Sequence, residues 1–218
     1  MPAQSALRSK SAADFSLIET IRWEPGQGFL RLEQHLRRLT RSADALGFRQ
    51  PLHVTKLLEE AVEGAATPMR ARLTVSFRGK AEVAATAFEP VAEDTVWKLK
   101  IAKQTLLSDD TLFRHKTSRR DPYEAARAEY SPEEADEVLL LNERGELCEG
   151  TITNLFVEAE DGQLLTPALN CGLLPGVLRA ELIRERKARS EVLKPADLKH
   201  RRIFVGNSLR GLIPAELV

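Results

Sequence analysis

The chain has 218 residues, of which 43% are hydrophobic and 29% charged, a composition that excludes a fibrous or an intrinsically disordered protein. Its 32 Lys and Arg residues balance its 32 Asp and Glu residues, which excludes a global attraction to nucleic acid or to an anionic membrane. No apolar run approaches the roughly 20 residues that span a bilayer. Only Cys148 and Cys171 are present, so we expect a reducing, cytoplasmic location and buried thiols.

The first half of the chain predicts a compact α+β unit over residues 14–102. Its first dozen residues, MPAQSALRSKSA, are polar and lack the apolar core of a signal peptide, so we expect a frayed terminus. Apolar residues at period two predict strands over residues 15–23, 69–77, 83–88 and 96–101. Helical spacing predicts one helix from Arg31 that is closed by Gly47, and another between Pro51 and Gly64. Residues 103–110 are the predicted linker.

The second half predicts a mixed α/β domain with a curled sheet. Short apolar stretches predict strands over residues 138–141, 151–158, 163–166 and 203–205. Helices are predicted over residues 122–130 and 177–188.

Three stretches that join ordered elements are rich in glycine, hydroxyl groups and small residues: 149–154, 172–177 and 206–211. The second leads into a helix, where the free amides of Val177 and Leu178 and the helix dipole could hold a phosphate dianion. The alternative is a Pro-Gly helix start with nothing bound. Taken singly, these residues favour structural roles: Lys116 would be a surface lysine, Glu149 a turn carboxylate, and residues 35–39 a solvated basic helix face.

The order of five motifs favours a catalytic interpretation. They are His-x-x-Arg-Leu at 35–39, a lysine at 116, Glu-Gly-x-x-x-Asn-Leu-Phe at 149–156, Leu-Pro-Gly-x-x-Arg at 174–179 and Asn-Ser-Leu-Arg at 207–210. In this order they resemble the class IV aminotransferase family, which includes branched-chain and D-amino-acid transaminases and 4-amino-4-deoxychorismate lyase. The resemblance covers nearly everything from Phe15 to Ile213.

The resemblance implies a fold-type IV enzyme of two domains that uses pyridoxal 5′-phosphate (PLP). The smaller N-terminal α+β domain would span residues 1–106, and the C-terminal PLP-binding α/β pseudobarrel domain, with its curled sheet, residues 107–218. Family members are homodimers, so we expect a homodimer here, with no metal, nucleic acid or membrane partner.

Carried over residue by residue, the resemblance makes Lys116 the catalytic Schiff-base lysine and Glu149 the partner of the pyridine nitrogen. Arg38 becomes the phosphate-binding arginine. A carboxylate at the ring nitrogen keeps it protonated, so that the ring can accept electrons. Further cofactor contacts are expected from the Thr151 and Thr153 hydroxyls, from the helix-start amides of Val177 and Leu178, and from Ser208 and Leu209.

The lysine segment favours one branch of the family. Its Lys-Thr-x-x-Arg pattern at 116–120 resembles aminodeoxychorismate lyases, which convert 4-amino-4-deoxychorismate to 4-aminobenzoate and pyruvate for folate synthesis. The substrate's two carboxylates could be bound by Arg119 and Arg210, with Arg120 and Tyr123 as further candidates. Two alternatives remain: a transaminase of branched-chain or D-amino acids, and a catalytically dead binding protein on the same scaffold.

Overall fold

The computed structural model describes residues 15–218, so the predicted frayed terminus lies outside the described residues. The chain forms two compact units. The first extends to Glu89 and includes Lys116–Arg119, whereas the second comprises Pro90–His115 and Arg120–Val218. The domain division at residues 106 and 107 stays a prediction.

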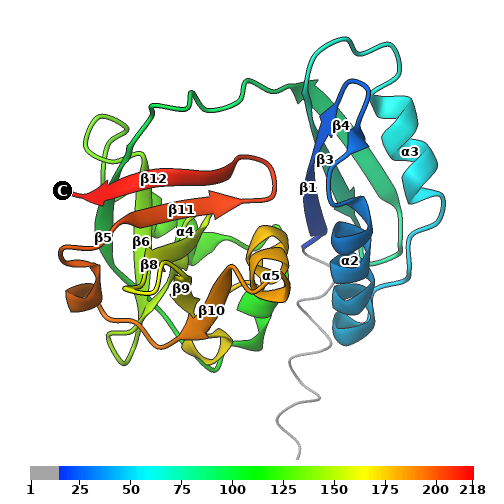
Figure 1. The fold of residues 1–218 in the computed structure, drawn as a ribbon. Helices are drawn as coiled ribbons and strands as arrows, with labels where there is room; N and C mark the ends of the chain where they lie inside the picture. The colour runs from blue at the N-terminus through cyan, green and yellow to red at the C-terminus, as the bar shows by residue number, and fades with distance from the viewer. Residues whose placement is uncertain (1–14) are drawn as a thin grey trace, which may run out of the picture. The chain divides into compact units, whose positions relative to one another are not determined.

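The first unit is a four-stranded antiparallel sheet with two helices (Figure 1). The strand order is β2-β1-β3-β4. The elements are β1 (Leu17–Glu24), β2 (Gly28–Phe29), α2 (Leu32–Leu46), α3 (Val54–Ala61), β3 (Met69–Val75) and β4 (Ala81–Ala87). Ile21, Leu58 and Ala71 form a fully buried cluster that joins α3 to the sheet.

The predicted end of α2 is confirmed at Gly47. This residue has φ 74°, a left-handed conformation that glycine adopts without steric cost. The amide of the next residue, Phe48, then donates to the carbonyl of Ala43 at 2.9 Å. The second predicted helix is also present, but it ends at Ala61, before the expected Gly64.

The second unit is built on an eight-stranded mixed sheet with the order β10-β9-β8-β11-β12-β5-β6-β7. Its strands are β5 (Trp97–Leu106), β6 (Glu137–Asn142), β7 (Leu147–Gly150), β8 (Asn154–Glu158), β9 (Leu164–Pro167), β10 (Ala188–Glu191), β11 (Ile203–Asn207) and β12 (Gly211–Leu217). The edge strand β7 approaches β8 and β9, which lie far from it in strand order, because the sheet curls as predicted (Figure 1).

Two helices and three 3₁₀ turns complete the second unit: η1 (Thr111–Arg114), α4 (Asp121–Arg127), η2 (Leu169–Cys171), α5 (Val177–Arg184) and η3 (Pro195–Leu198). Successive β6 residues face opposite sides of the sheet. Leu139 joins one buried cluster with residues of β7, β8 and β11, whereas Val138 and Leu140 join another with Tyr123 of α4.

Two predictions about the middle of the chain were wrong. The strand expected over residues 96–101 does not complete the first sheet; as β5 it pairs in parallel with β6 and β12 of the second sheet. It also continues to Leu106, so that residues 103–110 are not a linker throughout. The pattern of alternation located the strand, but its partners lie more than thirty residues away in sequence, as the pairing of Leu99 with Glu137 shows.

Leu139→Ala is expected to lower the free energy of unfolding by about 2–5 kcal/mol, because Leu139 is fully buried and its truncation leaves a cavity in the core. Urea denaturation would measure the change. Leu107→Ala is the matched control, since Leu107 is 59% exposed and should lose less than about 0.5 kcal/mol. Equal effects of the two substitutions would contradict the assigned core.

Candidate active site

Lys116 lies beside β1 in the first unit, although the sequence placed it at the start of the second half. The Ile18 amide donates to the Lys116 carbonyl at 2.8 Å, and Thr117 forms a bridge with Leu17. On the other side, the Ser118 amide donates at 2.8 Å to the carbonyl of Ser16, the residue before β1. The backbone at Lys116 is therefore held against the sheet by hydrogen bonds on both sides.

A buried carboxylate, Glu19 on β1, organises the functional side chains of α2. Arg38 donates to its two oxygens, from Nε to Oε1 at 2.9 Å and from Nη2 to Oε2 at 2.6 Å. His35 Nδ1 lies 2.6 Å from Oε2 and must carry the proton of this hydrogen bond, because the ionised carboxylate can only accept. Glu19 and His35 are both 1% exposed.

The charges around His35 and Glu19 favour a neutral imidazole and an ionised carboxylate. Burial lowers the pKa of His35, and the positive charges of Arg38 and Lys116 lower it further, against the opposing effect of Glu19. The influence of Lys116 shows that its ammonium group lies within electrostatic reach of His35. Burial alone would raise the pKa of Glu19, but Arg38 and His35 outweigh it and hold the pKa at about 2.

The depressed pKa of Glu19 predicts a pH-dependent stability. With an ordinary value of 4.5 and a folded value of about 2, ionised Glu19 contributes about 3 kcal/mol. This contribution is complete above pH 4.5 and disappears as the pH falls toward 2. Glu19→Gln should therefore be less stable than the wild type near neutral pH, and the difference should shrink over this range in urea denaturation.

The control for this prediction is Glu33→Gln. Glu33 and Arg37, which both lie on α2, form an exposed ion pair, and exposed pairs contribute little to stability. A stability difference between Glu19→Gln and the wild type that stays constant from pH 6 to pH 2 would contradict the ionised, Arg38-bound carboxylate.

Glu149, at the end of β7, is the corresponding buried carboxylate of the second unit and is 4% exposed. Its Oε1 accepts hydrogen bonds from the Tyr123 hydroxyl at 2.7 Å and from the Leu174 amide at 3.0 Å. Its Oε2 accepts a longer one, at 3.3 Å, from the Asn154 side-chain amide. Donors from α4, β8 and the loop before α5 thus converge on one carboxylate.

The Thr151 and Thr153 hydroxyls, both predicted cofactor contacts, donate to a different carboxylate in this structure. Glu137, which is fully buried, accepts from Thr151 Oγ1 at 2.6 Å and from Thr153 Oγ1 at 2.8 Å. It also accepts from the backbone amides of Thr151 and Ile152, at 2.9 and 3.0 Å. Glu137 therefore fixes the turn between β7 and β8, and a role of the two hydroxyls toward a cofactor stays a prediction.

The two predicted phosphate contacts of the second unit lie close together. A Cβ placed on Gly206, at the end of β11, would come within 3.2 Å of Leu178 in the first turn of α5. The turn after β11 is shaped by Asn207, whose Oδ1 accepts from the amides of Leu209 and Arg210 at 3.0 and 2.9 Å. The helix start and this turn are therefore brought side by side, as a shared phosphate site requires.

Gly176, the residue before α5, connects the helix start to Glu149. A Cβ at this position would lie 1.8 Å from Asn154 Oδ1, a distance that no side chain tolerates. The Asn154 amide group also donates to the Leu174 carbonyl at 3.1 Å, so that Asn154 binds both the loop and Glu149. Arg179, on the first turn of α5, is buried and interacts electrostatically with Glu149, which opposes the lowering of its pKa by burial.

The four candidate substrate-binding residues occupy different surroundings. Arg119 packs over the Phe15 ring in the first unit, and Arg210 over the Trp97 ring in the second. Arg120 donates to the Thr151 carbonyl at 2.5 Å. Tyr123 is 8% exposed, and its hydroxyl donates to Glu149. Substrate binding by these four residues stays a prediction.

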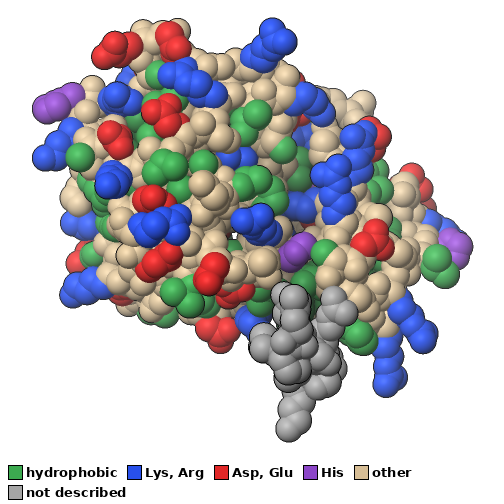
Figure 2. Space-filling view, turned by 90° about the horizontal axis from the view of Figure 1, so that it is seen from below, with side chains coloured by type: hydrophobic (Ala, Val, Ile, Leu, Met, Phe, Trp, Pro, Cys, Tyr) green, Lys and Arg blue, Asp and Glu red, His purple; other side chains and the backbone are tan. Residues whose placement is uncertain are grey.

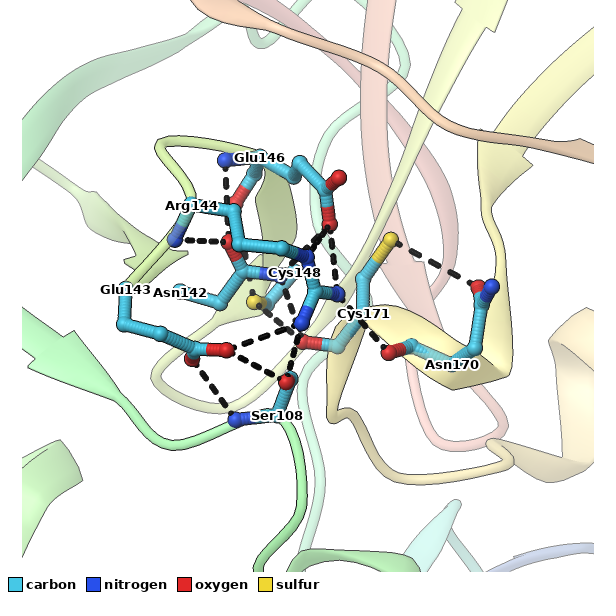
Figure 3. Close-up of polar contacts among 8 residues, drawn as sticks. All are labelled: Ser108, Asn142, Glu143, Arg144, Glu146, Cys148, Asn170 and Cys171. Carbon is cyan, nitrogen blue, oxygen red and sulfur yellow. Dashed lines mark hydrogen bonds and ion pairs between the residues drawn. The ribbon is translucent and has the colours of Figure 1, made fainter.

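A surface network around Arg144 secures the loop that leads toward α5 (Figure 3). Arg144 lies in the β6–β7 turn and forms ion pairs with Glu143 at 2.8 Å and Glu146 at 2.7 Å. It also donates to Ser108 Oγ and, at 3.1 Å, to the Asn170 carbonyl in η2. Three segments that are distant in sequence are thereby joined at the base of the 172–176 loop.

Both cysteines are buried, as predicted, and lie in this same region. Burial raises the pKa of Cys171 to about 11 and moves that of Cys148 still higher, so both remain thiols near neutral pH. Cys148 contacts the Cys171 carbonyl at 3.2 Å. Burial and the raised pKa values thus both disfavour the reactive thiolate form.

The described residues also limit other kinds of site. Between residues 15 and 218, His, Cys, Asp and Glu side chains form no group of three or more that could hold a metal ion. Within the same range, none of the helices combines the length and apolarity needed to cross a membrane. Acidic and basic side chains are intermixed on the face shown in Figure 2.

Three site residues escaped the sequence interpretation: Glu19, Glu137 and Asn154 as a ligand of Glu149. A signal for the first two was present, because each is a single carboxylate in or beside an apolar strand, LIETI at 17–21 and EVLLL at 137–141. A buried carboxylate requires donors or a cation, so such a residue marks an organised polar site.

Comparisons with known proteins cover nearly all of the described chain. The amino-transferase class IV family matches residues 16–218. A solved structure from Mesorhizobium loti, provisionally named an amino-acid aminotransferase, is 55% identical, with a TM-score of 0.92 over 94% of this chain and 100% of that one.

Two further relatives bear the provisional name of lyases. An aminodeoxychorismate lyase of Schizosaccharomyces pombe is 29% identical over 93% of this chain and 90% of its own length. A solved 4-amino-4-deoxychorismate lyase is 27% identical, with a TM-score of 0.80 over 95% of this chain and 85% of that one. The similarity confirms the predicted fold of a small antiparallel unit and a curled mixed sheet.

Proposed function

The chain belongs to the class IV aminotransferase family, and on that premise we propose that it is a PLP-dependent lyase of 4-amino-4-deoxychorismate. It would convert this substrate to 4-aminobenzoate and pyruvate. The family uses PLP, and its members include both lyases and aminotransferases. The single observation that carries the PLP-dependent chemistry is the buried Glu149 carboxylate with its three hydrogen-bond donors, which suits a partner for a protonated pyridine nitrogen.

The residues present fit PLP. Glu149 would accept the hydrogen bond of the ring N–H, and a buried carboxylate gains from such a cationic partner. Arg38, the first-turn amides of Val177 and Leu178, and the turn at Ser208 and Leu209 would hold the phosphate dianion. When bound, PLP supplies an electron sink for the carbon skeleton of an amine substrate.

The chain's own residues would do the rest of the chemistry. Lys116 would hold the cofactor covalently through Nζ and, once released by the substrate amine, would take a proton from the substrate ring carbon. Loss of that proton and cleavage of the C–O bond would leave an aromatic ring and release enolpyruvate, which becomes pyruvate by taking up a proton, for which the protonated Lys116 is available. Arg119 and Arg210 would bind the two substrate carboxylates by charge-assisted hydrogen bonds.

The lysine segment and the two lyase relatives support the lyase. A transaminase is the second candidate, because the 55% identical structure is provisionally named an amino-acid aminotransferase. In a transaminase the same lysine would return the proton to a carbon of the cofactor instead of releasing pyruvate. The substrate's amino group would then be transferred to a 2-oxo acid. The homodimer and the cytoplasmic location stay predictions.

Treatment of the PLP-loaded protein with sodium borohydride is expected to fix the cofactor on the peptide that contains Lys116. Peptide mass spectrometry would identify the modified residue. Lys116→Ala should lose this label and all turnover but retain some non-covalent PLP binding. Lys103→Ala, at an exposed position on β5, should behave as the wild type does. A label on another lysine would contradict the assignment of Lys116.

The substrate assay decides between the two activities. We expect release of 4-aminobenzoate and pyruvate from 4-amino-4-deoxychorismate, with no activity in Lys116→Ala. In parallel, branched-chain and D-amino acids would be supplied with 2-oxoglutarate, and glutamate measured. Glutamate formation without 4-aminobenzoate would overturn the lyase and support the transaminase.

A further inference from the structure

The contact between Tyr123 and Glu149 has the features of a permanent charge-assisted hydrogen bond. The hydroxyl lies 2.7 Å from Oε1, and the two side chains are 8% and 4% exposed. Burial and the adjacent carboxylate raise the pKa of Tyr123, which favours the protonated hydroxyl. Tyr123 is therefore a donor to Glu149 and is not poised to transfer a proton itself.

The position of the Tyr123 ring is fixed by its packing. The ring stacks edge-on against Phe113 at 5.9 Å between centroids, and the Arg120 guanidinium lies 4.9 Å from its centre. The ring also belongs to the buried cluster beneath α4. Because the ring cannot follow a moving partner, its hydroxyl constrains the side chain of Glu149.

The two donors to Oε1 also give the carboxylate a defined orientation. A carboxylate oxygen has two lone-pair sites, and those of Oε1 are filled by Tyr123 and by the Leu174 amide. A further cationic donor is therefore directed toward Oε2, which the Asn154 amide contacts at the longer distance of 3.3 Å. Hydrogen bonds of this kind favour the ionised form of a carboxylate over the protonated form.

We propose that Tyr123 is a positioning residue that holds Glu149 ionised and oriented toward the pyridine nitrogen of PLP, and that it does not bind substrate. The inference rests on the proposed cofactor role of Glu149. Tyr123 was predicted to bind substrate, but its hydroxyl already donates to Glu149, so the inference gives it a different role. It also explains why a tyrosine follows the Lys-Thr-x-x-Arg segment on the buried face of α4.

The decisive readout is the protonation of the ring nitrogen in holoenzyme loaded with ¹⁵N-labelled PLP. In Tyr123→Phe, Glu149 loses a donor and becomes more basic, so the proton between Glu149 and the ring nitrogen should shift toward Glu149, by about a factor of ten or more in this equilibrium. Nitrogen-15 NMR over a pH series would measure this shift. We also expect kcat to fall about ten- to a hundredfold with little change in KM.

Tyr130→Phe is the matched control. Tyr130 is the only other tyrosine in the sequence, and its hydroxyl donates to the Ile101 carbonyl at 3.0 Å beside the same buried cluster. This variant also loses one hydroxyl and one hydrogen bond, but it has no contact with Glu149 in the described structure. It should keep the wild-type nitrogen titration, which separates positioning from a general effect on stability.

A second variant protects the test against poor folding of Tyr123→Phe. Site-specific 3-fluorotyrosine at position 123 keeps the ring and the hydroxyl but makes the hydroxyl a stronger donor, which lowers the basicity of Glu149, so the shared proton should shift toward the ring nitrogen. In a Glu149→Gln background, Tyr123→Phe should cause no further shift, because Tyr123 acts through Glu149.

Three outcomes would overturn the proposal or its premise, and they can be told apart. An unchanged nitrogen titration in both position-123 variants would refute the positioning role. A rise in KM with constant kcat would return Tyr123 to the substrate. If Glu149→Gln itself left the nitrogen titration unchanged, or the wild type took up no PLP, the proposed function would fail together with this inference.

Discussion

A carboxylate that is removed from water is costly unless donors or cations surround it, and the second unit is arranged to meet this requirement at Glu149. Its donors come from α4, from β8 and from the loop before α5. These elements are separated in sequence by up to 51 residues, the separation of Tyr123 and Leu174. The curl of the eight-stranded sheet brings them together, so that the fold and the polar site depend on each other.

In the first unit the buried carboxylate is Glu19, and it is stabilised by the positive charge of Arg38. The paired hydrogen bonds from Arg38 to Glu19 hold the guanidinium in one orientation before any ligand arrives. A side chain that is already ordered loses less conformational entropy on binding, so a phosphate would meet a preorganised cation. Burial and positive neighbours lower the pKa of His35, which favours its neutral form, so His35 donates a third hydrogen bond to Glu19 without adding a charge.

Local patterns predicted most of the elements, whereas pairings between distant strands could not be predicted from them. Gly47 and the Pro175-Gly176 pair marked two helix ends correctly, because both act through local backbone geometry. The strand β12 was missed because Pro214 lies within it, and proline usually excludes a central strand. The candidate residues came from the order of motifs, but the residues that hold them, such as Glu19, become visible only when the chain is folded.

The close approach of Gly176 to Asn154 couples the residue at the start of α5 to the hydrogen bonding of Glu149. A methyl group at position 176 would have to displace the Asn154 side chain, which cannot move without disturbing its bond to Glu149. Substitutions at these positions should therefore be tolerated only in combination. In related proteins we expect the two residues to vary together, and in directed evolution a change at either one should modify reactivity without touching a bound molecule.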